Sequence, residues 1–182
     1  MTPRSPGVPP LPPEDHRCGE CGFDYATVGV QQALGMIREV PGAVRAVVDA
    51  LPRQALQQRP REGTWSVTEY VCHLRDVYVS YTIRLHRART EDRPVLEPML
   101  NDLRARRFRY NSRDVRPVLD ELADAAAGCC DEVARVEATG WDRVVTRLPG
   151  EERTARWLVR QAAHEGVHHL QDLRDVARVV AP

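Results

Sequence analysis

The chain has 182 residues, a length typical of one domain, and its 26 basic and 26 acidic residues balance, which argues against binding to nucleic acid or a membrane surface. Every basic residue is arginine, which excludes a Schiff-base lysine and the lysine of a phosphate-binding P-loop. No apolar run is long enough for a membrane span or a signal peptide, so we expect a cytoplasmic protein.

The N-terminal part of the sequence divides into a tail and a cysteine-containing turn. Residues 1–16 are rich in proline and polar side chains and predict a disordered tail. Residues 17–26 contain Cys18-Gly-Glu-Cys21, whose glycines permit the tight backbone of a C-x-x-C turn. Because the five cysteines are odd in number, they do not suit a secreted disulfide framework.

Two interpretations of the cysteine turn remain open at this point. Cys18 and Cys21 are either free thiols in an exposed, redox-active turn or half of a second zinc site. In the second case the remaining ligands would be His16, or Cys129 and Cys130.

Helical periodicity dominates the rest of the chain and predicts an all-α four-helix bundle over residues 27–182. The first helix is expected over residues 28–51, with Pro41 kinking or splitting it. The second begins at a capping box formed by Ser66 and Glu69 and carries the strongest apolar stripe.

The second half of the sequence predicts two more long helices, over residues 114–138 and 151–179. Residues 52–63 are predicted to form a linker, and residues 94–111 a long connection with one short helix. Residues 144–148 suggest a short extended piece, but no alternation is strong enough to predict a sheet.

The last predicted helix carries two pairs of metal-ligating residues at a spacing of four. His164 and His168, with Glu165 between them, spell the H-E-x-x-H pattern of zinc proteases, and Glu165 with His169 forms the second pair. Helical phase places Glu165 and His169 on the apolar face, because they share an arc with Leu158, Ala162, Leu173 and Val176. We therefore favour the second pair as ligands. We expect His164 and His168 to be solvated or in an outer shell, and they become the ligands if the register is off by one residue.

His73 on the second predicted helix is the natural third ligand, since it flanks the apolar stripe two turns after the capping box. Two histidines and one glutamate, with a fourth position left to water, are typical of a catalytic divalent site. Asp172, one turn beyond His169, is either a partner that orients the ligand ring or a surface acid.

Two motifs carry a resemblance to a known family. Trp65-Ser-Val-Thr-Glu-Tyr-Val-Cys-His73-Leu resembles the W-S-x-x-E-x-x-x-H-L start of the second helix in the DinB-like superfamily. Glu165-x3-His169-x2-Asp172-Leu173 resembles the last-helix motif of its mycothiol-dependent maleylpyruvate isomerase branch, whereas other branches have histidine at position 165. The resemblance implies a four-helix bundle that holds zinc or nickel at one end.

The same resemblance implies a metal-dependent transferase or isomerase that activates a low-molecular-weight thiol toward a small electrophilic substrate. The all-arginine composition favours an actinobacterial source and therefore mycothiol as the thiol. The alternatives are a metal-dependent hydrolase with water as nucleophile, and a non-catalytic metal-binding stress or redox protein. The sequence assigns no catalytic residue or substrate, and it leaves a homodimer open.

Overall fold

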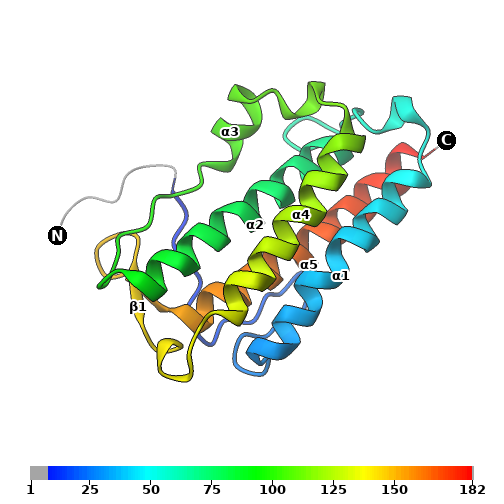
Figure 1. Cartoon of the computed structure of the whole chain (residues 1–182). Helices are drawn as coiled ribbons and strands as arrows, with labels where there is room; N and C mark the ends of the chain where they lie inside the picture. The colour runs from blue at the N-terminus through cyan, green and yellow to red at the C-terminus, as the bar shows by residue number, and fades with distance from the viewer. Residues whose placement is uncertain (1–7, 182) are drawn as a thin grey trace.

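The computed structural model describes residues 8–181 and is built almost entirely of helices (Figure 1). Four long helices form a bundle: α1 (Val30–Asp49), α2 (Val67–Thr90), α4 (Val115–Ala134) and α5 (Ala155–Val180). The short helix α3 (Asn101–Arg107) lies in the connection between α2 and α4. The predicted all-α four-helix bundle is confirmed.

The helices that follow one another along the chain are not all neighbours in the bundle. α1 packs against α4 and α5, and α2 packs against the same two helices, so α1 and α2 lie at opposite corners (Figure 1). Each long helix turns an apolar face to one shared core, in which the largest fully buried side chains include Trp157, Tyr25, Tyr78 and Ile37. α5 therefore contacts both α1 and α2.

Local sequence signals set several helix ends. The predicted capping box opens α2: the Ser66 hydroxyl accepts from the Glu69 amide at 3.2 Å, and the Glu69 carboxylate accepts from the Ser66 amide at 2.9 Å. α1 runs through Pro41 without a break, so the expected split is wrong. Val40 and Val44 on either side of Pro41 are buried in the core, and this packing holds the helix together despite one missing backbone donor.

The segment before α5 differs from the sequence prediction. Strands β1 (Val144–Thr146) and β2 (Glu152–Thr154) pair antiparallel, so the chain does contain a two-stranded sheet, and α5 begins at Ala155 rather than at residue 151. α4 also ends four residues early, at Ala134. Three 3₁₀ turns complete the described elements: η1 (Arg53–Ala55), η2 (Tyr110–Ser112) and η3 (Ala138–Gly140).

The N-terminal segment was expected to be disordered over residues 1–16, and residues 8–16 are instead ordered against the hairpin. Arg153 donates from Nε to the Pro12 carbonyl and from Nη2 to the Leu11 carbonyl, each at 2.7 Å. Glu14 accepts from the Thr154 amide at 2.8 Å. These bonds from distant residues replace a local secondary structure, and residues 1–7 lie outside the described part of the chain.

Within residues 8–181, no helix combines the length and apolar character that crossing a membrane requires.

Candidate metal centre

The structure brings His73, Glu165 and His169 together, although they come from two helices. His73 lies on α2, and Glu165 and His169 lie one turn apart on α5. The Glu165 Oε2 atom is 3.5 Å from His73 Nε2 and 3.2 Å from His169 Nε2. One ligand atom from each residue lies within 4.8 Å of the other two, so all three can reach a single ion.

Neighbouring side chains fix the orientation of these three groups. His169 Nδ1 lies 2.8 Å from Asp172 Oδ2, which leaves Nε2 to face Glu165. Gln161 donates to Glu165 Oε1 at 2.7 Å and leaves Oε2 facing the two histidines. A carboxylate behind a ligating histidine and a hydrogen bond to a ligating carboxylate are the usual supports of a metal site. Asp172 therefore lies where a supporting partner is needed.

The donor set suits a divalent ion on two further grounds. His73 is only 2% exposed, and its Nε2 atom is buried without a hydrogen-bond partner among the described residues. An unpaired buried polar atom costs free energy, and an ion between the three residues would remove this cost. Two imidazoles and one carboxylate are also a common ligand set for catalytic zinc.

Charge in the site is arranged around the Glu165 carboxylate. Burial alone would raise the pKa of Glu165, but the adjoining rings of His169 and His73 hold it well below its usual range. Burial lowers the pKa of His73. Burial would also lower the pKa of His169, yet the carboxylates of Asp172 and Glu165 raise it to about 9. At neutral pH the His169 ring is therefore protonated, and its positive charge lies between the carboxylates of Asp172 and Glu165.

A cavity of about 460 Å³ opens beside the site and reaches Glu165 and Gln161. Its walls come from the α2–α4 connection and from the N-terminal segment 8–12. Three arginines line it: Arg84, Arg106 and Arg147. A small molecule with a negative group could thus reach the metal centre from the cavity.

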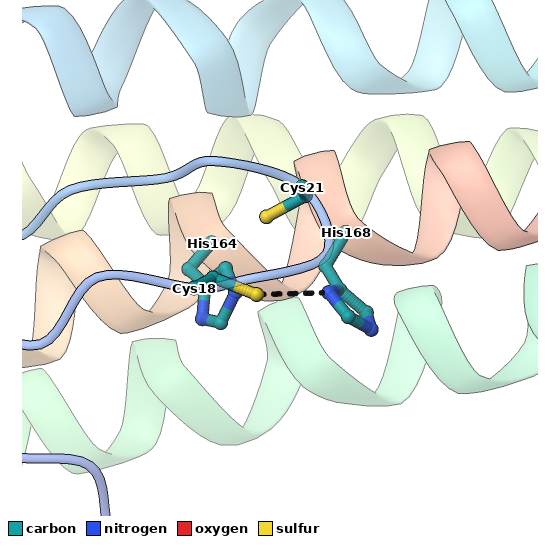
Figure 2. A group of neighbouring side chains, drawn as sticks. All are labelled: Cys18, Cys21, His164 and His168. Carbon is teal, nitrogen blue, oxygen red and sulfur yellow. Dashed lines mark hydrogen bonds between the residues drawn. The ribbon is translucent and has the colours of Figure 1, made fainter.

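The sequence predicts that His164 and His168 are solvated or in an outer shell. In the structure both are half-buried, because the N-terminal cysteine turn covers their face of α5 (Figure 2). Cys18 Sγ lies 3.6 Å from His168 Nδ1, and the Tyr25 hydroxyl lies 2.8 Å from His164 Nδ1. One ligand atom from each of Cys18, Cys21, His164 and His168 lies within 4.8 Å of the others. The four residues form a second cluster beside the first.

The residues predicted to complete a zinc site with Cys18 and Cys21, namely His16 or the pair Cys129 and Cys130, do not lie in the cluster. Cys129 and Cys130 are buried on α4 and belong to no metal-ligating group among the described residues. The His16 ring packs near His164 at 6.4 Å between centroids but is not part of the cysteine cluster. Cys129 and Cys130 serve as small apolar core residues, because both are buried. Burial also raises the pKa of both thiols, that of Cys129 to about 12.

Sequence reasoning missed two polar residues that link the clusters. The Tyr25 hydroxyl donates to Gln161 Oε1, and Gln161 in turn donates to Glu165. Gln161 could have been found, because it precedes Glu165 by four residues and so lies on the same face of α5. Tyr25 could not, because only the folded chain brings it to α5.

Comparison with known proteins places the fold. A family model described as the DinB superfamily matches residues 36–173. A curated protein of Geobacillus thermodenitrificans is 32% identical over 90 residues, which is 50% of this chain and 51% of the relative. One of Oceanobacillus iheyensis is 29% identical over 100 residues, or 54% and 58%. Both carry the provisional name of metal-dependent hydrolase, and the chain spans about half the length of these relatives.

Solved structures agree on the helical architecture. YfiT from Bacillus subtilis, described as a probable metal-dependent hydrolase with an unusual four-helix bundle topology, matches with a TM-score of 0.75 and 18% identity, over 93% of both chains. A mycothiol-dependent maleylpyruvate isomerase matches with a TM-score of 0.65 and 14% identity, over 85% of this chain and 67% of that one. At such identities the likeness shows the fold alone. The curated relatives come from Geobacillus and Oceanobacillus, so an actinobacterial source stays a prediction.

Proposed function

Because this chain belongs to the DinB superfamily, we propose that it holds one divalent ion through His73, Glu165 and His169 and activates a low-molecular-weight thiol toward a small electrophile. The observation that carries the proposal is the convergence of these three side chains beside a cavity that Glu165 lines. Zinc and nickel both suit two imidazoles and a carboxylate.

The ion, when bound, supplies a Lewis acid that lowers the pKa of a thiol below its free value of about 8.5. The residues around it prepare the site for this role. Asp172 keeps the proton of His169 on Nδ1, and Gln161 holds one oxygen of Glu165 so that the other faces the histidines. His73, Glu165 and His169 would hold the ion as three protein ligands, a number that leaves a tetrahedral ion able to take a thiol.

The cavity indicates which electrophiles fit. Arg84 and Arg147 hold their own partners, since Arg84 donates to the Glu97 carbonyl at 2.6 Å and Arg147 pairs with Glu151 at 2.9 Å. Arg106 is exposed and pairs with no acidic side chain in the described part of the chain. A guanidinium group with free donors binds carboxylates well. We therefore expect an anionic substrate, such as an unsaturated carboxylic acid.

Metal-dependent hydrolysis is the second candidate, and the names of the curated relatives favour it. The same ion could then activate water in place of a thiol. A non-catalytic metal-binding stress or redox protein is the third. The three candidates differ in their response to an added thiol.

The test is thiol titration of the nickel-loaded protein. We expect added mycothiol to increase the sulfur-to-nickel absorption above that of the protein's own thiols and to form a thioether with an unsaturated acid, which mass spectrometry detects. His73→Ala should abolish both, whereas His86→Ala should change neither, because His86 is an exposed histidine that pairs with Glu132 away from the site. Ester or amide hydrolysis without any thiol would favour the hydrolase, and no response to either would favour the non-catalytic protein.

A further inference from the structure

Cys18, Cys21, His164 and His168 lie next to the bundle site but take no part in it (Figure 2). We propose that these four residues form a second, structural zinc site, which fastens the N-terminal segment to α5. The proposal does not depend on the reaction at the first site, because the two donor sets share no residue.

The distances between the four donors suit zinc. One ligand atom from each residue lies within 4.8 Å of all the others. The distance of 3.6 Å between Cys18 Sγ and His168 Nδ1 is close to the separation of about 3.5 Å between a sulfur and a nitrogen ligand on tetrahedral zinc. Two thiolates and two imidazoles form a closed tetrahedral set that is typical of structural rather than catalytic zinc.

The backbone of the cysteine turn holds both sulfur atoms toward α5. The Cys18 amide donates to the Phe23 carbonyl at 2.8 Å, and the Gly22 amide donates to the Cys18 carbonyl at 3.0 Å. Gly22 adopts φ +74°, a conformation that costs other residues free energy. An antiparallel bridge between Arg17 and Asp24 closes the base of the turn. The turn is thus built by its own hydrogen bonds before any ion binds.

The hydrogen bonds of His164 leave one nitrogen free for a metal. Gln161 donates its amide N–H to Glu165, so its oxygen is left to accept from the Tyr25 hydroxyl. Having donated its only proton, the Tyr25 oxygen accepts from His164 Nδ1–H. His164 Nε2 then carries a lone pair, and it is buried without a hydrogen-bond partner in the described structure. A buried nitrogen with a free lone pair next to two thiols is expected of a metal ligand, because binding the ion would remove the free-energy cost of the unpaired acceptor.

His168 is oriented in the complementary way. Its Nδ1 atom faces Cys18, and its Nε2 atom lies 3.3 Å from Glu20 and 3.6 Å from Asp172. Carboxylates behind the second nitrogen fix the tautomer in which Nδ1 is the ligand. Each histidine of the cluster therefore presents one unprotonated nitrogen to the cysteines.

The ion would add a further connection between the N-terminal segment and α5. The cysteine turn continues from segment 8–12, which forms one wall of the cavity at the first site. Zinc between the turn and α5 would keep this wall in place.

The test is metal analysis of the full chain, purified under reducing conditions and loaded with zinc. We expect two equivalents in the wild type and one in the Cys18→Ser, Cys21→Ser double variant. His73→Ala should also keep one, and Cys130→Ala, a control for the loss of a thiol, should keep two. An unchanged zinc content in the double variant would overturn the proposal.

Cobalt substitution identifies the ligands. The wild type and His73→Ala should both show the sulfur-to-cobalt charge-transfer band without any added thiol, and the double variant should lack it. His168→Ala should lose the same equivalent while leaving both cysteines in place, which keeps the test informative if the double variant does not fold. A charge-transfer band that survives in His168→Ala at full metal content would assign the site to other residues.

Discussion

At Gly166 the packing of α5 leaves no space for a side chain. A Cβ atom there would lie 2.3 Å from the Tyr78 hydroxyl oxygen and 3.0 Å from Cγ2 of Val40. We therefore expect Gly166→Ala to destabilise the protein by about 1–3 kcal/mol, although alanine favours helices. Urea denaturation measures the change.

Removing the Tyr78 hydroxyl can test this contact, because the hydroxyl is buried without a hydrogen-bond partner in the described structure and its loss breaks no hydrogen bond there. Tyr78→Phe removes the closest atom and should restore most of the stability lost in Gly166→Ala. Gly128→Ala on α4 is the matched control, since nothing lies within 4 Å of its Cβ position, and it should stabilise by about 0.5–1 kcal/mol. Equal effects at Gly166 and Gly128 would show that the close contact does not exist.

Protonation of His169 should make metal binding at the bundle site depend on pH. With a pKa of about 9, the ring is protonated at neutral pH in the metal-free protein and must lose this proton to bind an ion. The affinity should therefore rise by up to about tenfold per pH unit up to pH 9 and then level off. Competition with a chromophoric chelator across this range measures it.

Asp172→Asn tests the cause of the pH dependence. The substitution removes one of the carboxylates that raise the pKa of His169, so the affinity should level off at a lower pH. At high pH the variant should still bind about 10-fold to 100-fold more weakly, because the ligand ring has lost its support. A pH profile identical to the wild type would mean that another group sets the dependence.

Among the elements, the α2–α4 connection is fastened by one buried carboxylate. Asp76 on α2 accepts from Arg104 of α3 at 2.6 Å and also from the Tyr110 hydroxyl of η2. We expect Asp76→Asn to reduce stability by about 2 kcal/mol, because the charge that these donors share is removed. Asp120→Asn should cost less than about 0.5 kcal/mol, since Asp120 is exposed and its ion pair with Arg45 is solvated. Thermal melting of both variants checks the difference.

The same carboxylate should contribute to acid sensitivity. Burial by itself would raise the pKa of Asp76, but Tyr110 and Arg104 hold it below its usual value. The stabilisation is therefore complete above the unfolded pKa of about 3.9 and is lost as the pH falls through the lower folded pKa. The stability difference between wild type and Asp76→Asn should shrink only below about pH 4, and a difference that shrinks near pH 6 would contradict this assignment.

Elements whose signals are local were predictable from the sequence. The capping box at Ser66 and the apolar stripe of α2 lie within one segment, and they gave the start and buried face of that helix. The position of segment 8–16 depends on a partner far along the chain, Arg153, and no local pattern indicates it. The hairpin β1–β2 is local, but its strands of 3 residues each are too short to show an alternating pattern.

For the histidines of α5, the sequence likewise predicts which face of the helix each one lies on, but not which distant segment covers that face. Helical phase separates Glu165 and His169 from His164 and His168, because periodicity fixes the angle around a helix axis. It could not tell what covers the outer face. That face meets the cysteine turn, where Cys18 lies 150 residues before His168, and only the fold brings the two together.

On the scale of the whole molecule, the N-terminal segment should matter for ligand binding more than for folding. Removing residues 1–12 deletes one wall of the cavity but leaves both clusters of metal ligands and the bundle core. We expect an unchanged fold and metal content, with thiol or substrate binding weaker by about tenfold, which corresponds to about 1.4 kcal/mol. Calorimetry on the metal-loaded protein measures the affinity, and binding as tight as in the full chain would exclude segment 8–12 from the binding surface.

The hydrogen bonds that run from His164 through Tyr25 and Gln161 to Glu165 make the two proposed metal positions thermodynamically interdependent. A cation on His164 Nε2 strengthens Nδ1–H as a donor, and each bond along such a row polarises the next. Occupancy of one position then alters the affinity of the other, and linkage requires the reverse effect to be equally large. Tyr25→Phe should leave both sets of ligands but make their affinities independent. A stronger hydrogen bond to Glu165 draws charge away from this carboxylate, so an ion at one position would weaken binding at the other, and the two positions would fill over a wider concentration range than two isolated sites.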